Sequence, residues 1–503
     1  MSETDQPIEE TQTEGPIVIR NHISVIFGNI ITLMIVLAFI VFVNRGTIVS
    51  AKDELGMHWW YLLPIIALFL FMIFIFWRRW KLTTYTFTDS ELRVFRNTIF
   101  KSEAHIQYSR LASVNVRRTI INHIFGTTQL LFNVNSSVNS NRAEAVLTLE
   151  SSEADRLRET ISSKIFKREM VIKEEETKES LVEISNFDVI LHGMFGQTTT
   201  QTIIGLLALA YSIGTFYFGN SAGSITALIV FALSTALPWI RTILRYYNYR
   251  IYRVDDTITV ESGLISNYRS SFNLKKVNSV RIREPLLARL MGRAILEAEV
   301  VGLADSNGLP LLCPLKNKAI VEQLSKELVP EFLFDFEKQG QPVQAKVPTL
   351  AFKIICSAIS VFIGSIIFIF GRIAGYENNI DKFLILLIAV SFAIIIPIIL
   401  LIHGLLAQRH REFAIGDETF MFAIGAYDRE TNFIRFDKVQ KTRVTGGPIQ
   451  RRFGVATCTV SLMSSSGVTN IESGIFDRET LERIPNEIMA RIKDGRYDYR
   501  RYQ

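Results

Sequence analysis

Cysteine is scarce in this sequence. The three cysteines, Cys313, Cys356 and Cys458, lie far apart and form no C-x-x-C pair. A disulfide framework and a zinc site both require more closely and regularly spaced cysteines, so neither is indicated. Histidine also shows no H-E-x-x-H spacing. His403 and His410 flank arginines beside an apolar run, which favours a solvated cluster over a metal site.

Motifs for nucleotide chemistry are missing as well. Neither G-x-x-x-x-G-K nor G-x-G-x-x-G occurs in the chain. Gly446-Gly447-Pro448 indicates a turn, and Ser464-Ser465-Ser466-Gly467 a hairpin loop rather than a nucleophile elbow. We therefore expect no catalytic residues, no cofactor and no metal. The net charge of +6 is explained by Lys and Arg retained on the cytoplasmic side of a membrane, so no nucleic-acid partner is expected.

Long apolar runs dominate the sequence instead. A bilayer requires about 20 apolar residues per spanning helix. Six runs approach that length: Ile23–Val43, Trp59–Trp77, Thr202–Phe218, Ile225–Leu244, Phe352–Phe370 and Phe383–His403. They are grouped as three hairpins. The third and fourth runs are the least apolar and contain Gly205, Gly214 and Pro238.

The distribution of Lys and Arg predicts the orientation of these hairpins. The ends of the even-numbered runs and the stretches after them hold Arg78, Arg79, Lys81 and Arg93, then Arg241, Arg245, Arg250 and Arg253, then Arg409 and Arg411. The linkers inside the hairpins hold fewer such residues. We expect a multi-pass protein of the cell membrane with both termini and all soluble domains in the cytoplasm. An acidic tail precedes the first run, which disfavours a signal peptide.

The soluble segments form an internal repeat. Three copies align without gaps on Asp89, Asp255 and Asp417. Eight residues after each anchor come Asn97, Gly263 and Gly425, which tolerate positive φ at a turn. Further on come the pairs Phe125-Gly126, Met291-Gly292 and Phe453-Gly454. Agreement at so many offsets establishes a three-fold repeat.

Each copy shows a run of strands followed by a helix. Val114 and Val116 alternate with polar residues, as do Val280 and Ile282 in the second copy, which is typical of a strand with one buried face. In the third copy Thr442 takes the place of a valine, so looser packing is expected there. Terminal helices are predicted from Ser152, over Lys318 to Leu328, and from Asp477. The predicted fold is therefore membrane α-helical hairpins plus all-β barrels, each capped by a C-terminal helix, in three repeats.

The domain boundaries follow from these patterns. We expect an acidic disordered tail at 1–22, hairpins at 23–77, 200–244 and 351–403, soluble domains at 78–167, 245–335 and 404–503, and linkers at 168–199 and 336–350. In the first linker, Phe187, Ile190, Leu191 and Met194 have amphipathic helical spacing. This helix could lie in the membrane interface or continue directly into the third run.

The layout resembles a known family. Paired spans, an Arg/Lys-Val/Leu-x-Ser-Val strand and a Phe/Met-Gly pair about a dozen residues later are similar to the bacterial pleckstrin-homology-like (PH domain) membrane proteins, and the triple copy resembles their YdbT type in Firmicutes. The resemblance implies a seven-stranded barrel with a C-terminal helix, six spans, and often a smaller one-domain PH-like membrane protein as partner. It also implies protection against secreted antimicrobial peptides, with no established catalytic residues.

Arginines on equivalent strands are the candidate contact residues. Arg117, Arg118, Arg281, Arg283 and Arg443 fall on the polar side of their strands, where they could contact anionic headgroups or a protein partner. The alternative is an ordinary charged face that pairs with local Glu.

Three classes of function remain open. The first is a non-enzymatic scaffold or assembly protein in the lipid bilayer, as a homo- or hetero-oligomer. The second is a transporter or export component that moves a peptide or lipid, although no run contains Asp or Glu. The third is an enzyme, which the motifs do not support.

Overall fold

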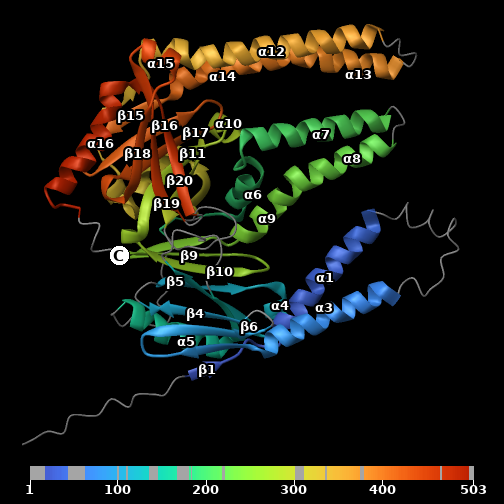
Figure 1. Ribbon diagram of the computed structural model, residues 1–503, viewed down its shortest axis with the longest axis vertical. Helices are drawn as coiled ribbons and strands as arrows, with labels where there is room; N and C mark the ends of the chain where they lie inside the picture. The colour runs from blue at the N-terminus through green and yellow to red at the C-terminus, as the bar shows by residue number, and fades with distance from the viewer. Residues whose placement is uncertain are drawn as a thin grey trace, which may run out of the picture. The chain divides into compact units, whose positions relative to one another are not determined.

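The computed structural model describes residues 17–43, 63–98, 101–108, 111–134, 145–166, 181–182, 184–217, 221–300, 311–334, 337–373, 379–464 and 467–497 (Figure 1). The chain divides into two compact units. The first unit contains the first repeat together with Ile265–Ser271, and the second contains most of the second repeat and all of the third.

The first unit carries one apolar hairpin and two antiparallel sheets. The hairpin consists of α1 (Ser24–Val43) and α3 (Leu63–Lys81). One sheet has β1 (Ile17–Ile19), β2 (Thr83–Phe87), β3 (Glu91–Asn97) and β4 (Lys101–Gln107) in that order. The strands β5 (Leu111–Arg118), β6 (Thr127–Val134) and β7 (Ala145–Glu150) pair in sequence, with α4 (Ile120–Ile124) after β5 and α5 (Ser151–Phe166) at the end. Leu92, Phe132 and Ile161 meet in one buried core, because the alternating apolar residues of the strands and one stripe of α5 face each other.

The last part of the segment 1–22, expected as a disordered tail, contains a strand. Ile17–Ile19 form β1 and pair with Tyr85–Phe87 of β2. An Ile-Val-Ile run has high strand propensity, and the edge of β2 supplies its hydrogen-bond partners. The acidic residues before it lie outside the described residues.

The second repeat begins with helices. These are α6 (Asn186–Phe195), α7 (Thr199–Tyr217), α8 (Ser221–Phe231), the π-helical segment η3 (Ala232–Ala236) and α9 (Leu237–Tyr246). The strands β8 (Arg250–Val254), β9 (Thr257–Ser262), β10 (Asn267–Asn273) and β11 (Val277–Glu284) follow, then α10 (Leu286–Leu290), β12 (Arg293–Val300), β13 (Leu311–Asn317) and α11 (Lys318–Leu328). The terminal helix α11 has the predicted bounds.

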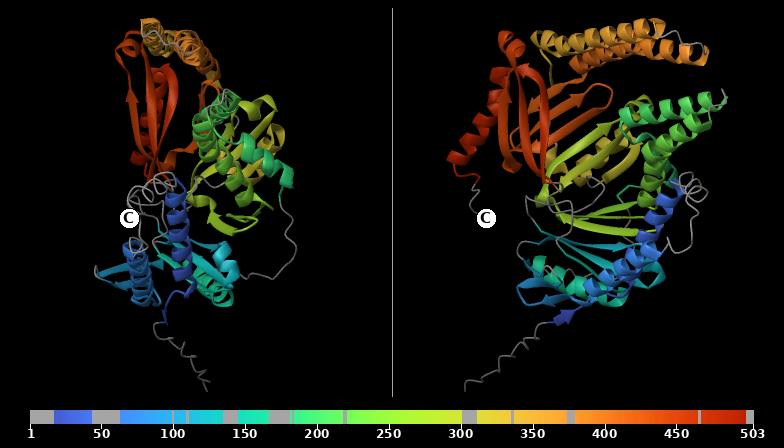
Figure 2. Two further views of the ribbon diagram at one scale, coloured as in Figure 1. Left: turned by 90° about the vertical axis from the view of Figure 1, so that its right-hand side faces the viewer. Right: turned by 45° about the vertical axis from the view of Figure 1, so that its right-hand side comes forward.

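The third repeat follows the same plan. After the two-residue strand β14 (Gln339–Gly340) come α12 (Lys346–Ile373), α13 (Asn379–Val390), the π-helical segment η7 (Ser391–Ile395) and α14 (Ile396–His410). The soluble part has β15 (Glu412–Ile415), β16 (Thr419–Gly425), β17 (Arg429–Arg435), β18 (Val439–Thr445), α15 (Pro448–Arg452), β19 (Val455–Ser464), β20 (Gly467–Asp477) and α16 (Arg478–Lys493). Both views of Figure 2 show α12 and α14 side by side.

One sheet extends through two repeats of the second unit. Its seven strands have the order β13-β12-β11-β17-β16-β15-β14, so β11 of the second repeat pairs antiparallel with β17 of the third. Antiparallel sheets followed by a helix confirm the predicted fold. In the described residues the sheets stay open and do not close into barrels, because strands that would close one repeat pair with the neighbouring repeat instead.

The Phe/Met-Gly pairs have one common structure. Gly126, Gly292 and Gly454 have φ of +63°, +66° and +69° and each ends a short helix. The carbonyl of each glycine accepts a hydrogen bond from the first backbone N–H of the terminal helix, at Ser151, Lys318 and Arg478. Glycine is favoured there because side chains raise the energy of left-handed backbone. The predicted positive φ is also present at Gly263 and Gly425, whereas Asn97 ends β3 without it.

Among the described residues, three helical stretches are long and apolar enough to cross a bilayer: Ala227–Tyr246, Val343–Ile373 and Ile385–His410. Ser24–Met34 and Thr199–Gly214 are shorter apolar helices. The aromatic residues at 59–61, predicted to begin the second run, lie outside the described residues.

Prolines explain the two π-helical segments. Pro238 and Pro397 are each the second residue after a π-helical segment. Proline lacks the backbone N–H that an α-helix requires. A carbonyl within η7, that of Phe392, instead accepts a hydrogen bond of 2.6 Å from the Ser360 hydroxyl of α12. Neighbouring helices and local π geometry thus satisfy the backbone groups that proline would leave without a partner.

The helix α6 is separate from the third run. It ends at Phe195 and α7 begins at Thr199, so the alternative of one continuous helix is wrong. A capping box of Ser185 and Asp188 begins it. Its buried residues include Val189 and His192. Of the predicted apolar set, Leu191 packs against the core, whereas Phe187 is 63% and Ile190 is 40% exposed. Contact of this exposed side with the membrane interface stays a prediction.

Candidate functional site: two pockets at a repeat junction

The paired strands β11 and β17 carry a pocket on each face of their sheet. The register places Arg281 opposite Asn432 and Ile282 opposite Thr431. Successive residues of a strand point to opposite faces. Ile282 and Glu284 therefore face one pocket, while Arg281 and Arg283 face the other.

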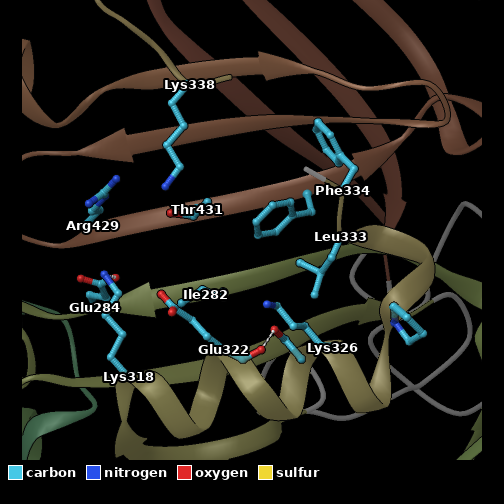
Figure 3. Close-up of a pocket in the computed structure, with 13 residues that line it drawn as sticks. Ile282, Glu284, Lys318, Glu322, Lys326, Leu333, Phe334, Lys338, Arg429 and Thr431 are labelled. Atoms are coloured by element: carbon cyan, nitrogen blue, oxygen red, sulfur yellow. Dashed lines mark hydrogen bonds and ion pairs between the residues drawn. The ribbon is translucent and has the colours of Figure 1, made fainter. Parts of the chain in front are cut away.

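The lysine pocket is a cavity of about 520 Å³ between α11, β11, β17 and the segment before α12 (Figure 3). Its apolar surface comes from Ile282, Pro330, Leu333, Phe334 and Phe433. Lys318 and Lys326 lie on α11, and Lys338 reaches toward Thr431 from the opposite side. An apolar floor with polar groups at the rim is typical of a ligand site.

Positive charge exceeds negative charge in the lysine pocket. Lys318, Lys326, Lys338 and Arg429 line it together with Glu284 and Glu322. Lys318 forms an ion pair of 2.8 Å with Glu284, and Arg429 one of 2.8 Å with Glu412 outside the lining. The Arg429 Nε is buried and has no partner among the described residues. The cavity suits an acidic group attached to an apolar body.

The arginine pocket, on the other face, has a volume of about 460 Å³. It lies between the strand pair and the segment that joins α6 to α7, with α9 beside it. The Arg281 guanidinium contacts Glu297 at 2.6 Å and Glu430 at 3.3 Å, and Arg283 contacts Glu297 at 3.2 Å. Glu297 belongs to β12 and Glu430 to β17, so this network connects three neighbouring strands.

The charge state of Glu297 follows from its two arginines. Burial tends to raise the pKa of this carboxyl, but Arg283 and Arg281 outweigh burial and lower the pKa to about 2. The carboxylate is therefore ionised at neutral pH, and its negative charge compensates two guanidinium groups in a site with little water.

Several polar atoms of the arginine pocket lack partners among the described residues. They are the Arg283 Nε, the His192 Nδ1 and the Gln197 Oε1, all buried. Burial, with a smaller contribution from Arg283, lowers the pKa of His192 to about 4, so its imidazole is neutral at pH 7. Buried polar atoms of this kind are usually satisfied by ordered water or a small polar ligand.

A second ion cluster fixes α6 beside this pocket. Asp188 contacts Lys316 at 2.7 Å and Arg293 at 2.8 Å, both from the sheet of the second repeat. Burial opposes ionisation of Asp188, but hydrogen bonds from Lys316 and Arg293 lower its pKa to about 2. The helix before the third run is therefore attached to the soluble sheet by charge as well as by packing.

The five predicted arginines lie in different environments. Arg281 and Arg283 lie together in the arginine pocket and pair with Glu. In the first unit, the Arg118 Nε donates to the Thr128 hydroxyl at 2.7 Å, and the Arg117 guanidinium lies 5.8 Å from the Tyr268 ring centroid. Arg443 is exposed on β18. Their contact with headgroups or a partner stays a prediction.

Sequence reasoning missed the acidic partners and the lysine pocket. Glu297 and Glu430 are distant in sequence from Arg281, and no local pattern connects them. The sequence signal for these partners was that Glu297 and Glu299 alternate with apolar residues in β12. Within the described ranges, no group of three or more His, Cys, Asp or Glu is close enough to hold a metal ion.

Comparison with known proteins agrees with the repeat. The family model for the bacterial PH domain matches residues 30–165, 203–328 and 360–492, so each match covers an apolar hairpin or part of it and the soluble domain that follows. The UPF0699 transmembrane protein YdbT of Bacillus subtilis (strain 168) is 21% identical in an alignment 420 residues long, which covers 77% of this chain and 81% of that protein. No solved structure matches the chain.

Proposed function

Because the chain belongs to the bacterial PH domain family, we propose that it is a non-enzymatic membrane scaffold that binds its partners through the PH-like domains. The observation that supports this most is the continuous sheet of the second unit, in which β11 and β17 join two repeats. Such a sheet holds binding surfaces in fixed positions beside the apolar helices. This arrangement suits the assembly of several molecules at a bilayer.

The lysine pocket is the proposed binding site for an acidic ligand group. Its cationic side chains surround an apolar floor, so a phosphate or carboxylate can pair with Lys326 and Lys338 while an apolar chain covers Phe334.

To test this site, the full chain would be purified from native membranes, and bound lipids and proteins would be identified by mass spectrometry. A ligand lost from Lys326→Glu but retained by Lys493→Glu, an equal charge change on the exposed end of α16, supports the site. Equal retention by both variants contradicts it.

We propose that both termini and all three PH-like domains lie in the cytoplasm and that the chain has six spans in the cell membrane. The Lys/Arg pattern supports this orientation. A Lys493→Cys variant in a Cys356→Ser background tests it, because the other two cysteines are buried. A membrane-impermeant maleimide should label this cysteine only after permeabilisation. Labelling in intact cells would contradict the orientation.

Protection against secreted antimicrobial peptides is proposed as the physiological role, and a smaller one-domain PH-like membrane protein as a partner. Both come from the family resemblance. A deletion strain should be more sensitive to added cationic peptides, and the wild-type gene should restore resistance. Unchanged sensitivity would remove this role without affecting the scaffold proposal.

A transporter or export component remains the second candidate. The observation in its favour is the pair of π-helical segments, η3 and η7, at prolines in two hairpins. Such segments inside α-helices are frequently found at functional sites. Flux of a labelled peptide or lipid in proteoliposomes would favour transport, particularly if it persisted after deletion of the soluble domains.

A further inference from the structure

The two strands that pair between the second and third repeats, β11 and β17, have equivalents in the third and first repeats. By the repeat alignment, β18 is the equivalent of β11, and β4 is the equivalent of β17. Among the described strands, β18 pairs only with β19, and β4 pairs only with β3. The chain therefore presents a β11-type edge in its last repeat and a β17-type edge in its first.

Exposure distinguishes the paired strands from their counterparts. Six of the eight residues of β11 are buried and none is exposed. In β18, Gln440, Lys441, Arg443 and Thr445 are exposed. In β4, Ile106 is the one buried residue. Strands of equivalent sequence position thus differ according to whether a second neighbour is present.

The register of the pairing is the same wherever it occurs. In the second unit, Glu284 of β11 pairs with Arg429 of β17. Inside the first unit, Arg118 of β5 pairs with Asn267. Glu284 and Arg118 occupy the same position in their repeats, as do Arg429 and Asn267. The junction is therefore a property of the repeat and not of one copy.

Charged residues on an edge strand often prevent pairing with other chains. The exposed Lys441 and Arg443 of β18 could have that effect. However, Arg443 is the equivalent of Arg281, which lies in a paired strand and forms an ion pair with Glu430 across the junction. Arginine at this position is therefore compatible with the pairing. In the equivalent register, Arg443 faces Ala104 and Ser102, which carry no positive charge.

We propose that β18 of one molecule pairs antiparallel with β4 of a second copy of this chain, in the register that places Arg443 opposite Ala104. Each molecule then has one edge of each type, and the contact is heterologous. Contacts of this kind build head-to-tail rings or open chains of molecules. The partner of the edge is thus a second copy of this chain.

Cysteine pairs test the register directly. Cβ atoms of residues directly opposite in an antiparallel pair lie about 4.5–5.5 Å apart, within reach of a disulfide after small adjustments. Arg443→Cys and Ala104→Cys would be placed on separately tagged full-length copies, both with Cys356→Ser, and co-expressed. The matched control combines Arg443→Cys with Glu103→Cys, because Glu103 is adjacent to Ala104, is also exposed and lies on the opposite face of the strand.

Mild oxidation of the membranes should give a disulfide-linked dimer carrying both tags for the first combination, and a much weaker band for the control. If both cysteines react with a maleimide but no linked dimer forms, the proposal is overturned. It is equally overturned if Arg443→Cys becomes linked to a different membrane protein, or if both combinations give equal yields. Cysteine at these exposed positions leaves the core unchanged, so loss of folding does not confuse the result.

Discussion

Arg281 of the second repeat and Glu430 of the third form an ion pair of 3.3 Å across adjacent strands. The same guanidinium contacts Glu297 of its own repeat at 2.6 Å. Arg281 thus takes part in one contact within a repeat and one between repeats, and the two carboxylates are not equally buried. The Glu297 side chain is 10% exposed, whereas the Glu430 side chain is 27% exposed.

Replacement of the two carboxylates should therefore have unequal effects. Glu297→Gln leaves Arg281 and Arg283 without their common buried counter-charge, and should cost about 3–5 kcal/mol of unfolding free energy. Glu430→Gln removes one partly exposed contact and should cost about 1 kcal/mol or less. Chemical denaturation of the purified full chain in detergent measures both. Equal losses would show that the network is not organised around Glu297.

The neutral His192 makes stability depend on pH. Its pKa is about 4 in the folded chain against 6.5 for the ordinary group. Above pH 6.5 both states are neutral, and no stability is lost. As the pH falls from 6.5 to 4, the unfolded state binds a proton that the folded state does not, so up to about 3 kcal/mol should be lost.

His192→Phe should remove this pH dependence while keeping an aromatic ring beside Tyr246. Unfolding free energies measured between pH 7 and pH 5 provide the test, since Glu297 and Asp188, with a folded pKa of about 2, contribute only at lower pH. A variant that loses the same amount as the wild type between these pH values would show that other groups cause the effect.

Patterns of neighbouring residues predicted much of this fold, but they could not predict which strands distant in the sequence pair with each other. Positive φ was predicted at Gly263 and Gly425 and is present there, because a left-handed backbone favours glycine at the residue itself. The bounds of α11 followed from its own apolar spacing. In contrast, alternation in β11 shows which residues are buried but not which strand lies beside it, so the pairing with β17 was not predicted. The arginines were placed on the correct strands, yet their partners come from residues far along the chain.

Gly292 provides a test of the repeated turn. Its φ is +66°, and a Cβ there would have no heavy atom within 4 Å, so a substitution would act through the backbone alone. Gly292→Ala should cost about 1–2 kcal/mol, because side chains disfavour left-handed backbone. Gly292→Asn should cost less, since asparagine tolerates this region. Thermal unfolding of the full chain would rank the three proteins, and an alanine variant as stable as the wild type would contradict the backbone argument.

Gly364 of α12 allows close contact with the π-helical segment of the third hairpin. A Cβ at this position would lie 2.7 Å from the Ala393 backbone nitrogen and 2.8 Å from the Ala389 carbonyl oxygen. Backbone atoms cannot turn aside as a side chain can, so Gly364→Ala must push the helices apart, at a cost of about 1–3 kcal/mol. This movement would also lengthen the hydrogen bond from Ser360 to the Phe392 carbonyl.

Gly214→Ala is the matched control, because no heavy atom lies within 4 Å of a Cβ there. Resistance of the purified chain to unfolding by SDS should fall for Gly364→Ala and stay unchanged for Gly214→Ala. Equal resistance of the two variants would mean that the hairpin does not depend on this contact.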